Sequence, residues 1–167
     1  MTSIFKTSFK VAALVLSLSA AVASAQAVRT EKNMSLELAN LIASATLAAC
    51  STAGYNVGVA VVDRAGTLRA FQRADNAGPH TVAAAQGKAF TSASAKNTTL
   101  AMQDNVMKNP AAATLVHIPG FLIVGGGVPV KVGNEVIGAV GVGGAPGGHL
   151  DEQCAVAGLD KVKELLK

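Results

Sequence analysis

Two hydrophobic patterns, one with helical and one with extended spacing, alternate along the first half of the chain. Over residues 35–53 apolar side chains recur every three or four positions and Gly54 follows, which predicts a helix with a glycine stop. A valine-rich run at 56–63 and an alternating run at 67–73 predict a β-hairpin. A stretch of small residues at 80–95, opened by a proline, predicts a second long helix.

The second half of the chain predicts a short helix, three strands and a final helix. The short helix ends before Pro110, and valine-rich or glycine-rich runs predict strands at 121–124, 128–132 and 135–142. Gly133-Asn134 suits a two-residue hairpin turn, because glycine accepts the positive φ of the first turn position. The final helix is expected over Asp151 to Leu166. Hairpins in place of strand–helix–strand crossovers indicate an antiparallel sheet covered by helices, an α+β fold class.

The first 25 residues have the pattern of a cleavable secretory signal peptide. Two lysines precede an apolar run at 11–22, and Ala23-Ser24-Ala25 supplies small residues at the cleavage positions. A retained membrane anchor is the alternative, but a dozen apolar residues fall short of the ~20 that a spanning helix needs. We therefore expect a periplasmic or secreted protein that consists of a single domain over residues 26–167.

Charge and cysteine content narrow the function classes. Without Lys6 and Lys10 of the signal, the 14 basic residues fall to 12 against 10 acidic ones. That near balance, with few aromatic residues, argues against nucleic-acid binding. Cys50 and Cys154 form no CxxC motif, and they are expected either as one disulfide or as two buried thiols. The glycine-rich stretches lack the GK[ST] ending of a phosphate loop, and no GxSxG motif of a serine hydrolase occurs.

Histidines and cations supply the candidate binding chemistry. His80 and His149 each stand just before a predicted helix, where an imidazole either points into a pocket or is exposed in a turn. His149 with Asp151 and Glu152 is a candidate metal site that lacks a third fixed ligand. Three cations lie close to the predicted strands and the small-residue helix, and each either receives a ligand carboxylate or is solvated: Arg69, Arg73 and Lys88.

Three long segments together resemble one known family. They are VAVVDRAGTLRAFQRADNAGPHT, then GKAFTSA, then GGGVPVKVGNEVIGAVGVGGAPGGHLDEQCAVAG, and they span nearly all of the chain after the signal. In combination they look like the GlcG/HbpS-like haem-binding family, which is similar to the PduO C-terminal domain. The GPHT and GGHLDE forms, with His80 and His149, resemble the exported branch of that family.

The resemblance implies a fold and a cofactor. It implies a profilin-like, five-stranded antiparallel sheet with helices on both faces, the first and last helices on one face and the middle helices on the other. It also implies a homo-oligomer that binds haem or a related tetrapyrrole. Cys50 and Cys154 would then lie on neighbouring helices, which favours the disulfide.

The resemblance does not transfer an iron ligand directly. Some relatives use a ligand from the first helix, but that helix has no histidine here, only Met34 at its entrance. His80 is therefore the first candidate for cofactor binding and His149 the second, because neutral imidazole is a good donor to iron. Arg73 and Lys88 are the candidates for the haem propionates.

Three functions follow from these observations. The leading hypothesis is an exported haem-binding or tetrapyrrole-binding protein for storage, sensing or delivery, with no catalytic residues assigned. The alternative is a haem-degrading or peroxide-active enzyme, for which the sequence shows no dedicated acid/base pair. A third is a small-molecule binding accessory protein linked to the use of 2-hydroxy acids such as glycolate.

Overall fold

The computed structural model describes residues 28–167, so the expected signal peptide lies outside the described residues. Residues 31–167 form one compact unit. Within the described range, no helix is both long enough and apolar enough to span a bilayer.

The sheet of this unit has four strands in the described range: β1 (Gly58–Asp63), β2 (Leu68–Arg73), β3 (Gly127–Val132) and β4 (Glu135–Gly143). Their order across the sheet is β2-β1-β4-β3, and every neighbouring pair is antiparallel. The two predicted hairpins are therefore confirmed. Gly133 has φ +61°, as expected for the first position of the β3–β4 turn.

The expected fifth strand is wrong. Residues 121–124 form no strand because helix side chains bond the backbone amides of this segment and the residues just after it. The Leu122 N–H donates to Thr91 Oγ1 at 2.7 Å, and the Gly125 N–H donates to Gln103 Oε1 at 2.9 Å. The α+β class and the antiparallel sheet are confirmed with four strands, and the profilin-like arrangement stays a prediction.

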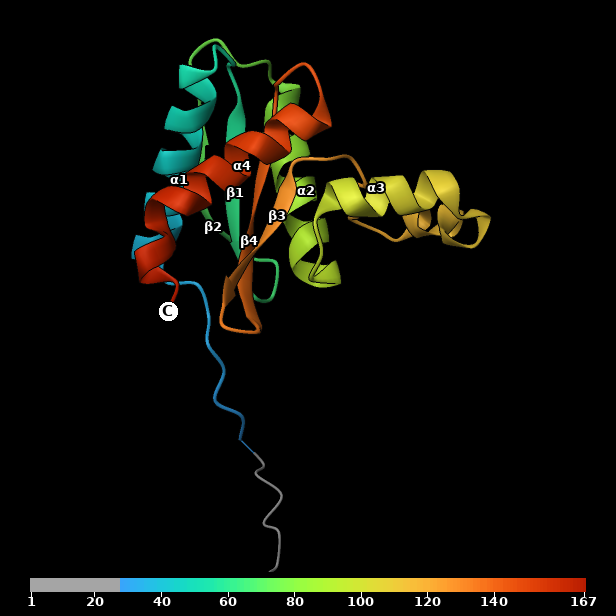
Figure 1. Ribbon diagram of the computed structural model, residues 1–167, viewed down its shortest axis with the longest axis horizontal. Helices are drawn as coiled ribbons and strands as arrows, with labels where there is room; N and C mark the ends of the chain where they lie inside the picture. Colours follow the sequence, from blue (N-terminus) through green and yellow to red (C-terminus); the bar gives the residue numbers. More distant parts are fainter. Residues whose placement is uncertain (1–27) are drawn as a thin grey trace, which may run out of the picture. The chain divides into compact units, whose positions relative to one another are not determined.

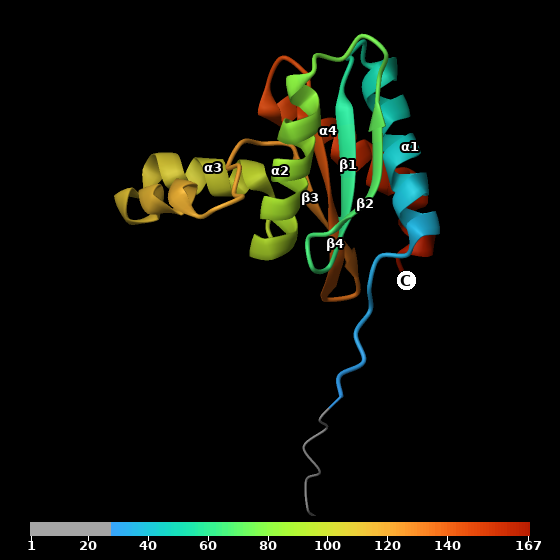
Figure 2. The ribbon, with the colours of Figure 1, turned by 180° about the vertical axis from the view of Figure 1, so that it is seen from behind.

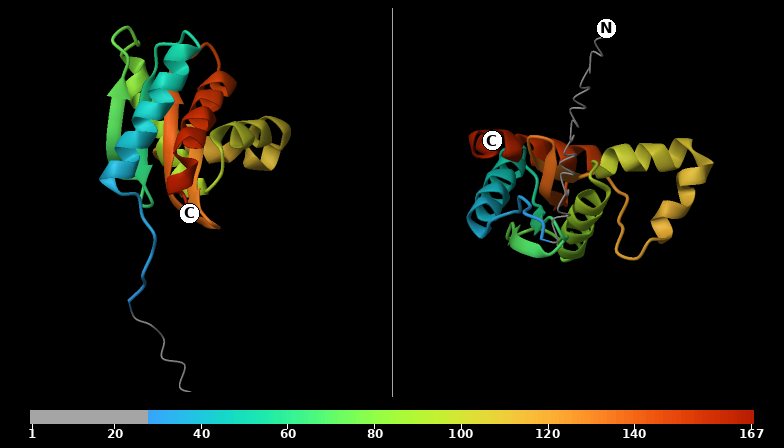
Figure 3. Two further views of the ribbon diagram at one scale, coloured as in Figure 1. Left: turned by 60° about the vertical axis from the view of Figure 1, so that its left-hand side comes forward. Right: turned by 90° about the horizontal axis from the view of Figure 1, so that it is seen from below.

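Helices cover both faces of the sheet. The first long helix, α1 (Leu36–Thr52), and the last, α4 (Gly148–Val162), pack side by side on one face (Figure 1 and Figure 3, left). Helix α2 (His80–Ala95) packs on the other face, toward the viewer in Figure 2. Every residue of β1 is buried, which is what a central strand between two helical layers requires.

The remaining helices depart from the expected layers. Helix α3 (Thr99–Lys108) and the 3-10 helix η1 (Pro110–His117) lie together as an arm beside the sheet instead of covering it (Figure 3, right). Large apolar side chains are exposed on and just after this arm: Met107, Val116, Ile118 and Val124. At the C-terminus α4 begins three residues earlier than predicted, and 3-10 helix η2 (Lys163–Leu165) follows it.

A disulfide fastens α1 to α4. Cys50 and Cys154 are joined, with their Cα atoms 5.2 Å apart and 104 residues between them in sequence. Both side chains are buried in the core between the sheet and these two helices. The disulfide favoured by the family resemblance is thus confirmed, and it closes most of the folded unit into one covalent loop.

Removing this cross-link is expected to destabilise the protein strongly. A loop of 104 residues restricts the unfolded chain, so the double variant Cys50→Ala/Cys154→Ala should lose about 4 to 5 kcal/mol in free energy of unfolding, measured by urea titration. Wild-type protein unfolded in the presence of a reductant should behave like the variant. Equal stability of the wild type with and without reductant would contradict the expectation.

Candidate functional site

The candidate site is an open pocket of about 420 Å³ at the end of the sheet where β4 stops. It is bounded by the first two turns of α2, the loop from β4 to α4, and the segment that returns from the arm. The residues that line it are His80, Ala84, Lys88, Leu122, Val124, Gly143, Gly144, Ala145, Pro146, Gly147, Gly148 and Asp151.

Helix geometry explains which α2 residues face this pocket. His80, Ala84 and Lys88 are spaced by four residues, so they lie on one face of α2, one above the other. His80 is exposed at the rim, and Lys88 is buried at the floor. The small side chain of Ala84 between them leaves space, and Leu122 and Val124 supply an apolar wall opposite.

A buried ion pair forms the floor of the pocket. Lys88 Nζ lies 2.7 Å from Asp151 Oδ2, and the two side chains are only 5% and 3% exposed. The other carboxylate oxygen of Asp151, Oδ1, accepts the Ala145 N–H at 2.9 Å. Asp151 therefore holds both the lysine of α2 and the loop that forms the pocket wall.

The backbone at Gly126 packs directly against the ion pair. Its φ is +122°, and a Cβ at this position would lie 2.7 Å from Asp151 Cβ and 3.1 Å from Lys88 Nζ. A larger residue would push into the ion pair, so only glycine fits both the backbone angle and the space. The two charged side chains are thus packed against backbone and at the same time contribute to the pocket lining.

Burial controls the protonation of this pair. Desolvation raises the pKa of Asp151 above its ordinary 3.8, and the hydrogen bond and charge of Lys88 offset that rise only in part. The N–H groups of Ala145 and Gly144 also act to lower the pKa. A carboxylate with a raised pKa takes up a proton more readily than an exposed aspartate does.

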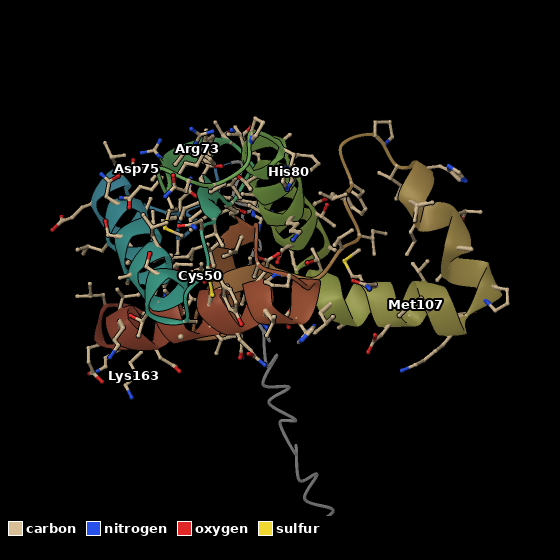
Figure 4. All side chains as sticks on the ribbon, turned by 90° about the horizontal axis from the view of Figure 1, so that it is seen from above. Cys50, Arg73, Asp75, His80, Met107 and Lys163 are labelled. Carbon is tan, nitrogen blue, oxygen red and sulfur yellow. A yellow bond between two sulfur atoms is a disulfide. The ribbon has the colours of Figure 1, made fainter. Side chains whose placement is uncertain are left out.

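The structure brings two of the four candidate residues together. His80 and Lys88 line the pocket, whereas His149 and Arg73 do not. The imidazole of His149 lies back against Gly147 and is exposed. Arg73 is exposed at the end of β2, and Figure 4 looks down on this end of the sheet, where it labels Arg73 and His80. The roles of all four residues in ligand binding stay predictions.

Two other candidates lie elsewhere. Met34 is buried at the opposite end of β4, where its N–H donates to the Ile137 carbonyl. Glu152 accepts the Leu100 N–H, and among residues 28–167 no group of three His, Cys, Asp or Glu is arranged to hold a metal ion. The metal site considered at His149 is therefore not formed by the described residues.

Sequence reasoning missed Asp151 as a member of the pocket. The sequence suggested Asp151 only as a candidate metal ligand beside His149, although an acid 63 positions from a lysine in a small-residue helix can meet that lysine across the fold. One signal was present. Lys88 is the one charged residue in the small-residue stretch 80–95, so its burial required an acidic partner.

The side chains that line the pocket suit a flat, apolar ligand that carries carboxylate groups at its periphery. The pocket offers an imidazole at the rim, an apolar wall and a buried ammonium at the floor. An imidazole nitrogen can ligate iron, an apolar wall can contact a tetrapyrrole ring, and an ammonium can receive a carboxylate. The residues present therefore fit a haem, with His80 and Lys88 as the groups that would hold it.

Comparison with known proteins defines the class. A family model described as haem degrading protein HbpS-like matches residues 34–160. The match covers most of the chain, including all four strands and the whole pocket, so this protein belongs to the HbpS-like family. The family expected from the sequence segments is confirmed.

Particular relatives agree with this assignment. Protein GlcG of Escherichia coli (strain K12) is 33% identical over 114 residues, which are 68% of this chain and 84% of GlcG. The crystal structure of a double mutant of Streptomyces reticuli HbpS is similar with a TM-score of 0.77 and 34% identity, over 94% of this chain and 99% of that one. The PduOC:heme complex shares the fold, with a TM-score of 0.68 and 22% identity over 77% of this chain and 94% of that one.

Breaking the ion pair should lower stability in a pH-dependent way. Lys88→Met leaves Asp151 buried without its partner, so the free energy of unfolding should fall by roughly 3 to 5 kcal/mol at neutral pH. Burial raises the pKa of Asp151 and Lys88 lowers it, so removing Lys88 raises that pKa further. The folded variant therefore holds a proton on Asp151 more tightly than the wild type or the unfolded chain does. The stabilisation by this proton is complete below the ordinary pKa of 3.8 and is lost as pH rises, so the deficit of the variant should shrink on acidification.

A matched control separates the buried pair from surface charge. Lys108 lies 3.8 Å from Asp104, and their side chains are 77% and 51% exposed. Lys108→Met should change the free energy of unfolding by less than about 1 kcal/mol, measured by urea titration across the same pH range. A similar small and pH-independent effect for Lys88→Met would contradict the account of the pair.

Proposed function

We propose that this protein binds haem or a related tetrapyrrole, for storage, sensing or delivery. The observation that carries the proposal is the meeting of an imidazole, a buried ammonium and an apolar wall in one open pocket. Membership of the HbpS-like family supports it, and the PduOC:heme complex supports it at the level of fold. Bound haem would supply an iron centre, and the chain would supply its ligand, its apolar contact and its counter-charge.

Each residue has a distinct role in this proposal. The exposed His80 would offer an imidazole nitrogen to the iron, and Leu122 and Val124 would supply the apolar contact to the ring. Lys88 faces a propionate from the floor of the pocket. His149 and Arg73, exposed at the same end of the sheet, are the further candidates for contacts outside the pocket.

Haemin titration of the purified protein tests the iron ligand. The wild type should give a sharp Soret band shifted from that of free haemin, and His80→Ala should lose that shift or bind at least about tenfold more weakly. His149→Ala is the second variant, and His117→Ala is the matched control, because His117 ends η1 outside the pocket. No shift in the wild type would contradict haem binding, and an unchanged spectrum in the His80→Ala variant would contradict the assigned ligand.

Haem degradation is the second candidate function, because the matching family is described by that activity. Incubation of the haem-loaded protein with a reductant and oxygen distinguishes the two. Verdohaem or biliverdin-like absorption would favour the enzyme, and persistence of the Soret band would favour a binding protein.

Export and self-association complete the proposal. The signal-like first 25 residues support delivery to the periplasm or the medium. A homo-oligomer is supported by the apolar side chains exposed along the arm and by the open side of the pocket, where Val124 is 41% exposed. A second subunit against this side would shield both.

One preparation tests both points. Full-length protein expressed in a host with a secretion system should be recovered outside the cytoplasm with Gln26 as its first residue, identified by intact mass and N-terminal sequencing. Light scattering on that material should give a mass of at least two chains. Cytoplasmic material that retains Met1 would contradict export, and a monomer at micromolar concentration would contradict the oligomer.

A further inference from the structure

We propose that this pocket selects carboxylate-bearing ligands by exchange: the ligand carboxylate replaces Asp151 beside Lys88 Nζ, and Asp151 takes up one proton from solvent. The inference rests on the proposed function for its ligand, since haem carries two carboxylates. It adds a proton-linked step carried out by the chain's own residues.

The ion pair is the charged part of the pocket lining that a ligand carboxylate would contact. Lys88 and Asp151 both line the pocket, and the backbone at Gly126 packs against both side chains. A carboxylate that enters the pocket along the apolar wall therefore meets the ammonium and its partner carboxylate together. Lys88 carries its charge on a flexible four-carbon stem, so Nζ can turn from one carboxylate to another without movement of α2.

Charge balance requires the proton. The free pocket holds one buried cation and one buried anion, at 4% and 2% residue exposure. A second carboxylate would leave an excess negative charge in a desolvated place, which is costly. Protonation of Asp151 restores the original balance, with the ligand carboxylate as the new anion.

The two oxygens of Asp151 divide the task. Oδ1 accepts the Ala145 N–H and can keep that bond in either protonation state, so the pocket wall stays in place. Oδ2 is the oxygen that Lys88 releases, and it receives the proton. The new O–H then donates to the incoming carboxylate, which replaces the bond that Lys88 made to Asp151.

Burial raises the pKa of Asp151, so protonating this carboxylate requires less free energy than protonating an exposed aspartate. Besides Lys88, the titratable groups on the helices that carry the pair include His80 on α2 and His149 and Glu152 on α4. His80 also lines the pocket and would bind the iron. The test must therefore distinguish proton uptake at Asp151 from any change in the number of protons on His80.

Calorimetry with two ligands makes that separation. Haemin and haemin dimethyl ester offer the same iron to His80, but only haemin has free carboxylates. Titrations slightly above neutral pH in two buffers of different ionisation enthalpy give the number of protons bound with each ligand. The wild type should take up about one more proton with haemin than with the ester, and its affinity for haemin should rise up to about tenfold for each unit fall in pH relative to the ester.

Matched carboxyl variants identify the proton acceptor. Asp151→Asn should abolish the difference in proton uptake between haemin and the ester. Glu152→Gln, on the same helix and bonded to the Leu100 N–H in the wild type, should retain the difference. Lys88→Met should lose the preference for haemin over the ester. The comparison of the two ligands on wild-type protein stands even if a variant does not fold.

The outcomes are distinguishable. Haemin binding with equal proton uptake for both ligands, or with the difference intact in Asp151→Asn, overturns the exchange and leaves haem binding standing. If haemin does not bind, the proposed function fails, and sodium propionate is titrated instead while the ¹³C shift of the Asp151 carboxyl is followed. A shift toward the protonated value then supports exchange with a different acidic ligand, and no shift overturns it.

Discussion

The ion pair between Lys88 and Asp151 links the two helical layers of this protein at the end of the sheet. Lys88 comes from α2 on one face, and Asp151 comes from the first turn of α4 on the other. The same carboxylate fixes the loop from β4 through the Ala145 N–H, and the backbone at Gly126 closes over both charges. Removing either partner would leave an uncompensated buried charge, so this pair holds α2 and the start of α4 together at the pocket floor, and Asp151 also holds the pocket wall.

The fold has further sources of stability besides this ion pair. The Cys50–Cys154 disulfide and the apolar core hold α1 and α4 on their face of the sheet. The pocket itself is built from a helix face, a loop rich in glycine and a segment that pairs with no strand. The disulfide and the apolar core therefore support the fold together with the buried ion pair, which also lines the pocket.

The sequence predicted those features that depend on local pattern. The bounds of α2 and both hairpins follow from helical spacing, alternation and turn residues, and they agree with the structure. The failures involve long-range contacts. Residues 121–124 have strand-like composition, yet Thr91 and Gln103 side chains bond their segment, and no local pattern shows that. Likewise Lys88 was identified as a candidate, but its partner Asp151 lies 63 residues away and was recognised only in the folded chain.

The central claim is that the buried pair forms the floor of the ligand site. A crystal structure of the protein grown with haemin tests this most directly. The account predicts a tetrapyrrole against Leu122 and Val124, with an imidazole nitrogen of His80 on the iron and a propionate oxygen within hydrogen-bond distance of Lys88 Nζ. Haem bound at another surface, with the pocket empty and Lys88 still paired only with Asp151, would contradict it.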